Sequence, residues 1–79
     1  MRIPRNLSGA LLVKRLECLG YVVTRQTGSH LRLTSQTVGI HHLTIPAHDP
    51  LRIGTLAAIL DSISKHHGLT KDELLQRLF

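Results

Sequence analysis

Histidine and arginine side chains in the middle of the chain have the spacing that proton transfer beside a phosphate requires. His30 follows Gly28-Ser29, and Arg32 comes two residues later. Side chains two residues apart in a strand point to the same face of a sheet, so this imidazole and this guanidinium are predicted to be neighbours. Imidazoles gain and lose protons near neutral pH, and guanidinium groups hold phosphate oxygens through paired hydrogen bonds. His42 and Thr44 repeat the alternation in a later segment and are expected on the same polar face.

Short segments with alternating apolar and polar residues are predicted to form the sheet that carries these side chains. They are Tyr21–Gln26, Ser29–Ser35 and His41–Ile45. In the second segment, Leu31 and Leu33 alternate with polar residues. This pattern is typical of an antiparallel sheet that has one packed face and one solvated face.

The first strand and the turn after it are less determined. Thr27-Gly28 favours a type I turn with Gly28 as the left-handed bulge residue over a two-residue primed turn, because a β-branched threonine avoids positive φ. Val22 and Val23 are both apolar, so the parity of this strand is ambiguous. The sequence therefore leaves open which face Arg25 occupies.

Helices are predicted on both sides of these strands in the chain. Ser8 is the expected N-cap of a first helix that runs to about Leu19 and ends at Gly20. Gly54-Thr55 is expected to open a second helix of about ten residues, which Gly68 stops.

A capping box predicts one more short helix at the end of the chain. Thr70 and Glu73 have the T-x-x-E spacing of such a box, so the helix is expected over Lys71–Leu78. The predicted fold class is therefore α+β, in the order α-β-β-β-α with a short extra C-terminal helix. A three-stranded antiparallel sheet is expected to carry its helices on one face.

Length and composition limit the functions that the chain could have. The chain has 79 residues and a formal net charge of +5. This length excludes a multidomain enzyme, a dinucleotide-binding domain and a large cofactor cavity. Tyr21 and Phe79 are the only aromatic residues of the Phe, Trp and Tyr types, so stacking of bases on aromatic platforms is not expected. Cys18 is the single cysteine, which excludes an intrachain disulfide and a cysteine-built zinc site.

The charge and the lack of a long apolar run indicate a location and a class of partner. No run approaches the length of a membrane helix, and residues 1–15 do not have the pattern of a signal peptide. A cytoplasmic location without membrane contact is expected. The excess of positive charge points first to a nucleic acid and second to an acidic protein.

A series of motifs in this sequence resembles the HicA toxin family, the small RNA-cleaving toxins of bacterial and archaeal toxin–antitoxin pairs. In order, they are Gly20-Tyr21, Arg25, Gly28-Ser29-His30, Thr44-Ile45-Pro46-x-His48 and Leu51-x-x-Gly54-Thr55-Leu56-x-x-Ile59-Leu60. The resemblance covers nearly the whole chain and predicts one HicA-like domain over residues 1–79. The segments that depart from the family's usual pattern are Thr34–His42, Asp61–His67 and Thr70–Phe79.

The resemblance implies a fold similar to that of double-stranded-RNA-binding domains, an mRNA interferase activity and a HicB-like antitoxin that masks the active surface. The catalytic histidine of the family falls on His30. RNA supplies its own nucleophile, the 2′-hydroxyl group, so no cofactor and no metal are expected. Arg32 and Arg25 are expected to hold the phosphate. His48 is the candidate for the second proton-transfer group, with His42 behind it.

Other polar residues are candidate contacts to the RNA, each with a simpler alternative. The candidates are Ser29, Arg52 and Thr55, together with Arg2, Arg5, Lys14 and Arg15 near the first helix. The Ser29 hydroxyl could only satisfy the backbone of the hairpin. The amides of Gly54-Thr55 could bind phosphate, or this pair could only start a helix that packs closely under the sheet. The basic residues near the first helix could only increase solubility.

Two other readings of the whole chain compete with the enzyme. The first is a non-catalytic module that grips RNA as double-stranded-RNA-binding domains do, and the second is an interaction protein whose basic face docks an acidic partner. A zinc site built from His30, His42 and His48 is not expected, because no pair has the spacing of a helical metal motif. His66-His67 is expected at a helix end, where it would favour the negative pole of the helix.

Overall fold

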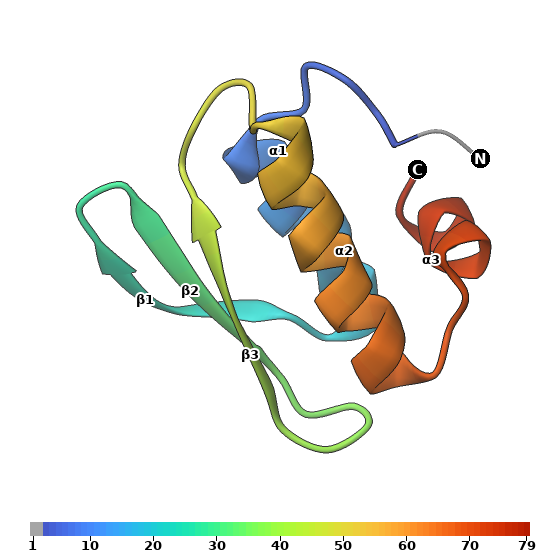
Figure 1. The fold of residues 1–79 in the computed structure, drawn as a ribbon. Helices are drawn as coiled ribbons and strands as arrows, with labels where there is room; N and C mark the ends of the chain where they lie inside the picture. Colours follow the sequence, from blue (N-terminus) through green and yellow to red (C-terminus); the bar gives the residue numbers. More distant parts are fainter. Residues whose placement is uncertain (1–2) are drawn as a thin grey trace.

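The computed structural model describes residues 3–79 and contains an antiparallel sheet with helices on one face (Figure 1). The elements are α1 (Gly9–Arg15), the 3-10 helix η1 (Leu16–Leu19), β1 (Val22–Thr27), β2 (His30–Ser35), β3 (His41–Pro46), α2 (Ile53–His67) and α3 (Lys71–Leu78). The sheet is three-stranded with the order β1-β2-β3, and both pairs are antiparallel. The predicted fold class and element order are confirmed.

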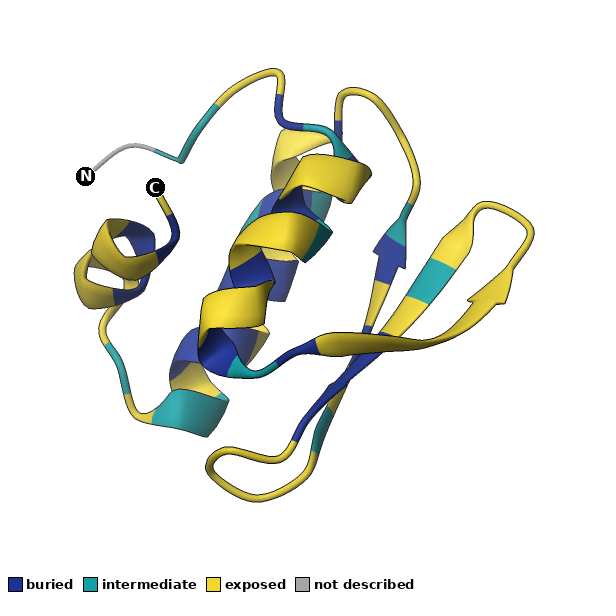
Figure 2. Cartoon of the chain, turned by 180° about the vertical axis from the view of Figure 1, so that it is seen from behind, coloured by how far each residue is buried: buried dark blue, intermediate teal, exposed yellow. Residues whose placement is uncertain are grey.

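The core lies between the sheet and the helices, as the alternation in β2 predicts. Leu33 pairs with Leu43, and Leu31 pairs with Ile45, so these side chains share the face toward the helices. Leu33 and Ile45 are fully buried there. In Figure 2, buried positions appear in the helices and in β2 and β3, whereas β1 is exposed along its whole length. α3 packs on the other side of the helices from the sheet (Figure 1).

A β-bulge in β1 settles the orientation of Arg25. Val23 pairs with Leu33, but Arg25, two residues later, pairs with Arg32 on the opposite face of β2. In a regular strand Val23 and Arg25 would point the same way, whereas the extra residue of the bulge reverses the parity. Arg25 therefore shares the solvent-facing side of the sheet with Arg32.

Both ends of the first helical segment follow the signals in the sequence. The Ser8 hydroxyl accepts a hydrogen bond from the Leu11 amide at 3.1 Å, which confirms the N-cap. The last predicted turn is the tighter 3-10 helix η1, and it ends at Gly20 in the left-handed conformation, with φ of 82°. Gly28 also has a positive φ, 56°, but Thr27 pairs with His30, so the loop has only the two residues Gly28-Ser29. The predicted type I turn closed by Gly28 is therefore wrong, and a two-residue loop with glycine first is typical of a primed turn.

The second helix is longer than predicted. α2 begins at Ile53 rather than at Gly54-Thr55 and has 15 residues, with Arg52 at the N-cap position and Gly68 at the C-cap. Close packing under the sheet is not the reason for Gly54, because a Cβ atom there would meet no neighbouring atom within 4 Å. The expectation that Gly54 lies where the helix packs closely under the sheet was wrong, because Gly54 is exposed in the first turn of α2.

The last helix and its capping box are confirmed. The Thr70 hydroxyl accepts from the Glu73 amide at 3.1 Å, and the Glu73 carboxylate accepts from the Thr70 amide at 3.0 Å. These hydrogen bonds lower the pKa of Glu73. No helix within residues 3–79 is long and apolar enough to cross a membrane.

Candidate functional site

The solvent-facing side of the sheet carries four of the predicted site residues, His30, His42, Arg25 and Arg32, and we call it the wet face. Its members are Val22, Thr24 and Arg25 on β1, His30, Arg32 and Thr34 on β2, and His42 and Thr44 on β3. Arg32 lies between Arg25 on one side and Thr44 on the other. His30 lies between Thr27 and Pro46 at the end of the hairpin, and its side chain is exposed. The structure thus brings two imidazoles, those of His30 and His42, and two guanidinium-bearing residues to one open surface.

The segment after β3 is held next to His30 by backbone contacts. The Ala47 amide donates to the Ser29 carbonyl at 2.6 Å, and the Gly9 amide donates to the His48 carbonyl at 2.9 Å. Gly9 must be glycine, because a Cβ atom there would overlap the carbonyl oxygen of Pro46. His48 is therefore fixed at its backbone, two residues beyond the partner of His30, with its side chain exposed.

His42 lies further along the wet face, and its ring is oriented by a threonine. Its Nδ1 atom is 2.8 Å from the Thr34 hydroxyl, which is 3.5 Å from the Thr24 hydroxyl. Thr24 in turn donates to the Arg32 carbonyl at 3.3 Å. Nδ1 is thus the ring nitrogen of His42 that contacts Thr34, and Nε2 is the one that does not. His42 pairs with Thr34 of β2, and Arg32 lies between Thr34 and His30 on that strand.

The remaining predicted contacts lie away from the centre of the wet face. Arg52 is exposed at the N-cap of α2, and Thr55 is half-buried in the first turn. Ser29 is exposed in the turn before His30, where its carbonyl, not its hydroxyl, holds the neighbouring segment. The basic residues Arg5, Lys14 and Arg15 are exposed near α1, and Arg2 lies outside the described residues.

A tyrosine–histidine cluster on the core side of the sheet was missed by the sequence analysis. Its members are Tyr21, His41, His66 and His67. The Tyr21 hydroxyl lies 2.6 Å from Nδ1 of His41 and 2.9 Å from Nε2 of His67. Because a phenol has one proton, one of these two histidine nitrogens must itself donate to the phenol oxygen.

The cluster joins the end of α2 to the starts of β1 and β3. His41 stacks on His66 with ring centroids 4.3 Å apart, and its Nε2 lies 3.1 Å from the Ser62 hydroxyl. The role predicted for His66-His67, a favourable charge at the helix end, does not describe His67, whose ring bonds to a buried phenol. One signal was present in the sequence: His41 has the same strand parity as Leu43 and Ile45, which marks the core side.

Burial shifts the pKa values of Tyr21, His41 and His67 in this cluster. Desolvation lowers the pKa of His41, and the charges of His66, His67 and His42 lower it further. Desolvation also lowers the pKa of His67, followed by the charges of His66 and Arg77. Burial raises the pKa of Tyr21 to about 12. The neutral forms of these rings are therefore favoured at neutral pH.

The six histidines do not assemble into a metal centre. Within residues 3–79, no group of three or more His, Cys, Asp or Glu side chains is arranged to hold a metal ion.

Fold and wet face together define a small α+β protein that presents histidine and arginine side chains on an open sheet surface. A family model described as the HicA toxin of bacterial toxin-antitoxin matches residues 9–69. No curated protein and no solved structure matches the chain. The family match spans most of the chain, and the chain therefore belongs to the HicA toxin family, as its motifs predicted. It is a toxin of the toxin–antitoxin type, and an antitoxin is its implied partner; α3 lies beyond the match.

Proposed function

We propose that this protein is a metal-independent endoribonuclease that cuts mRNA with His30 as its central acid–base group. The observation that carries the proposal is the exposed ring of His30 on the wet face, beside the row that Arg25, Arg32 and Thr44 form across the strands. In the reaction, the 2′-oxygen of a ribose attacks the adjacent phosphorus and the 5′-oxygen of the next nucleotide leaves. One group removes the 2′-hydroxyl proton and another protonates the leaving oxygen. The products are a 2′,3′-cyclic phosphate and a 5′-hydroxyl end.

The two arginines supply the electrostatic part of this mechanism. Arg25 and Arg32 are cross-strand partners, and the two positive charges of such a pair repel each other. A phosphodiester placed between them relieves that repulsion and is held by two guanidinium groups. The same charges stabilise the extra negative charge on the phosphate oxygens in the transition state. The bulge in β1 is thus the backbone device that completes the phosphate site.

His48 is proposed as the second proton-transfer group, ahead of His42. The backbone of His48 is held near the His30 end of the sheet through the contacts of Ala47 with Ser29 and of Gly9 with His48. His42 lies opposite Thr34, four residues beyond His30 along the register, which is about 13 Å at 3.3 Å per residue. Acid and base must both reach atoms of one phosphodiester, so the nearer residue suits the role better. Ser29, Arg52 and Thr55 extend the RNA contact around this centre.

The proposed antitoxin is HicB-like and covers the wet face. The chain has a net charge of +5, so an acidic protein surface would be attracted to it and would exclude RNA from Arg25 and Arg32. Toxin and antitoxin are proposed to meet in the cytoplasm, where the mRNA substrate also lies.

The decisive experiment compares RNA cleavage by the wild-type protein and by His30→Ala in the presence of EDTA. The wild-type protein is expected to leave 2′,3′-cyclic phosphate ends or their hydrolysis product. His30→Ala is expected to cut about 10²–10⁴-fold more slowly while it still binds RNA. His66→Ala is the matched control, because it removes a histidine from the other side of the sheet. Expression in a bacterial host should arrest growth for the wild-type and control proteins but not for His30→Ala.

Three outcomes would contradict the proposal in different ways. Unchanged cleavage by His30→Ala would remove this residue from the mechanism. Loss of wild-type cleavage in EDTA would indicate a metal-dependent reaction. RNA binding without cleavage by the wild-type protein would favour the non-catalytic binding module.

A further inference from the structure

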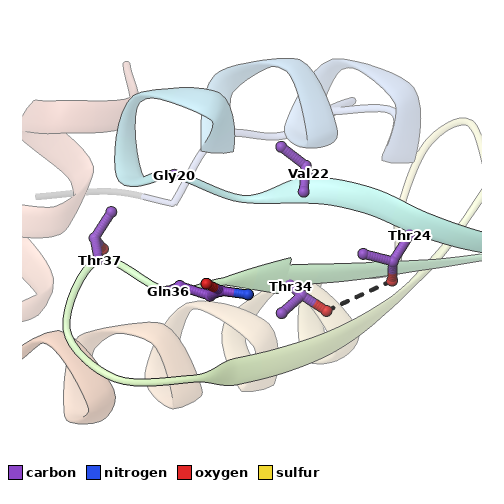
Figure 3. A pocket seen from close by; sticks show the side chains of 6 residues that line it. All are labelled: Gly20, Val22, Thr24, Thr34, Gln36 and Thr37. Carbon is purple, nitrogen blue, oxygen red and sulfur yellow. Dashed lines mark hydrogen bonds between the residues drawn. The ribbon is translucent and has the colours of Figure 1, made fainter.

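The wet face contains a hollow at the end opposite to His30. It has a volume of about 420 Å³ and is lined by Gly20, Val22, Thr24, Thr34, Gln36 and Thr37 (Figure 3). Volumes of this order are those of small-ligand pockets. The hollow lies between the start of β1 and the end of β2, so it opens on the same surface as the candidate site.

The lining is uncharged, apolar on its walls and polar at a few points. Val22 is 59% exposed and offers an aliphatic wall, to which the threonine methyl groups add. The hydroxyls of Thr24 and Thr34 and the side-chain amide of Gln36 supply hydrogen-bonding groups (Figure 3). A phosphate would find no cation in this lining. A flat, uncharged ring with polar edges fits it better.

The walls of this hollow are held in place by bonds to the core. The hydroxyls of Ser35 and Thr37 both donate to the Leu19 carbonyl, at 2.8 and 3.2 Å. The Thr37 methyl group occupies the space beside Gly20, where a Cβ atom would approach it to 2.5 Å. On the other wall, Thr34 is fixed by His42 and Thr24 by the Arg32 carbonyl. The hydroxyls of Thr24, Thr34 and Thr37 are therefore preorganised, and binding would order few side chains beyond Gln36.

We propose that this hollow binds one unpaired nucleobase of the RNA substrate, with adenine preferred. Along β2, Thr34 follows His30 and Arg32 on the same face, so a strand whose phosphate lies at Arg32 can place a neighbouring base here. A glutamine amide offers a donor and an acceptor side by side, the pair that adenine matches with N7 and its N6 amino group. Gln36 is the residue that reads the base, and Val22 provides the apolar contact. This inference rests on the proposed function, since it names a specificity pocket for the same substrate.

Binding is tested first, without any cleavage. The ¹⁵N-labelled protein is titrated separately with AMP, GMP, CMP and UMP, and the amide shifts are followed by NMR. AMP is expected to bind tightest and to shift the amides of Thr24, Gln36 and Thr37. Gln36→Ala should weaken AMP binding about tenfold, which is within the range for one bidentate base contact. Gln26→Ala is the matched control, because Gln26 is an exposed glutamine of β1 that does not line the hollow.

Two results of the titration would overturn the proposal. The first is a set of shifts confined to His30 and Arg32 for every nucleotide, which would indicate phosphate binding alone. The second is the absence of amide shifts at the hollow with any nucleotide, which would indicate that the hollow binds a side chain of a protein partner instead. Tighter binding of another base at the hollow would overturn the preference for adenine.

Cleavage is tested second, on a mixed pool of RNA whose cut sites are sequenced. Adenine should be enriched at one position near the cut for the wild-type protein and for Gln26→Ala. Gln36→Ala should lose that enrichment, because the side-chain amide that reads the base is removed. An unchanged cut-site profile for Gln36→Ala overturns the pocket and leaves the nuclease intact. AMP binding at the hollow in a protein that cuts no RNA supports the pocket and overturns the proposed function.

Discussion

Two sets of histidines in one small chain have opposite environments. His30, His42 and His48 are exposed on the wet face or beside it, and they are open to a ligand. His41 and His67 contact Tyr21, a residue that is 1% exposed on the core side of the same sheet, and His66 stacks on His41. The first set is the one proposed to exchange protons with a substrate, whereas the second connects the sheet to α2.

Strand parity alone separates the two sets. His41 and His42 are consecutive in β3, yet one pairs with buried Ser35 and bonds to Tyr21, while the other pairs with Thr34 on the wet face. Alternate side chains of a strand point to opposite faces, so a shift of one residue would exchange their environments. Residue type therefore does not decide the function of a histidine here; its position relative to the sheet does.

After the loss of His30, the largest effect expected within the first set is the loss of His48. His48→Ala should reduce the RNA cleavage rate about 100-fold or more, because a positioned acid or base contributes about 10²–10⁴-fold. His42→Ala should cause a much smaller loss, since His42 lies opposite Thr34, four residues along β2 from His30. Cleavage rates measured from pH 5 to pH 9 should also lose one limb of the profile in His48→Ala. A larger loss for His42→Ala than for His48→Ala would exchange the roles of these two residues.

The second set should affect stability and leave catalysis unchanged. Tyr21→Phe removes the hydroxyl that contacts both His41 and His67, without changing the volume of the core. Loss of one buried hydrogen-bonding group costs about 1–2 kcal/mol of the free energy of unfolding, which corresponds to a fall in Tm of about 5–10 °C. Thermal unfolding by circular dichroism measures the change, and the cleavage rate below Tm is the control. A fall in cleavage with no fall in Tm would place Tyr21 in the site instead.

The cluster also predicts how stability depends on pH. The pKa values of His41 and His67 are lowered in the folded state, so the unfolded chain binds protons more readily. Their contribution to stability is complete above the ordinary histidine value of 6.5 and is lost as the pH falls below it toward the folded-state values. The titratable groups that face them are Tyr21, His66, His42 and Arg77. Tm should decrease from pH 7 to pH 5, and less steeply in a His41→Gln protein; equal slopes would contradict this account.

The sequence predicts the fold better than it predicts the environment of single side chains. Alternation in β2, the cap at Ser8 and the capping box at Thr70 are local signals, and each was confirmed. The face of Arg25 was not predictable, because a β-bulge is set by the pairing of two strands and not by the pattern within one. The tyrosine–histidine cluster joins residues up to 46 positions apart, so no local pattern shows it. The exposed position of His30 agrees with its expected role, and that role stays a prediction.

The smallest effect expected concerns the stacked pair of histidines. His66→Gln removes a charge that lowers the pKa of both His41 and His67, while glutamine can still donate to the Gly39 carbonyl, which lies 3.3 Å from Nε2 of His66. Both pKa values should therefore rise toward 6.5 in NMR titrations, but only partly, because burial is the larger cause and remains. Stability at pH 8 should change little, and the loss between pH 7 and pH 5 should be smaller.

A control for this variant lies one residue away on α2. Lys65→Gln removes an exposed ion pair with Asp61, whose charged atoms are 3.0 Å apart. Pairs of this kind contribute about 0.3–0.5 kcal/mol, so the substitution should lower stability slightly at every pH. The pKa of His41 in the Lys65→Gln protein should be the same as in the wild type. If Lys65→Gln moved that titration as far as His66→Gln does, the stacked ring would have no special effect. The charge on His41 would then depend on the general field of the helix end and not on its contact with His66.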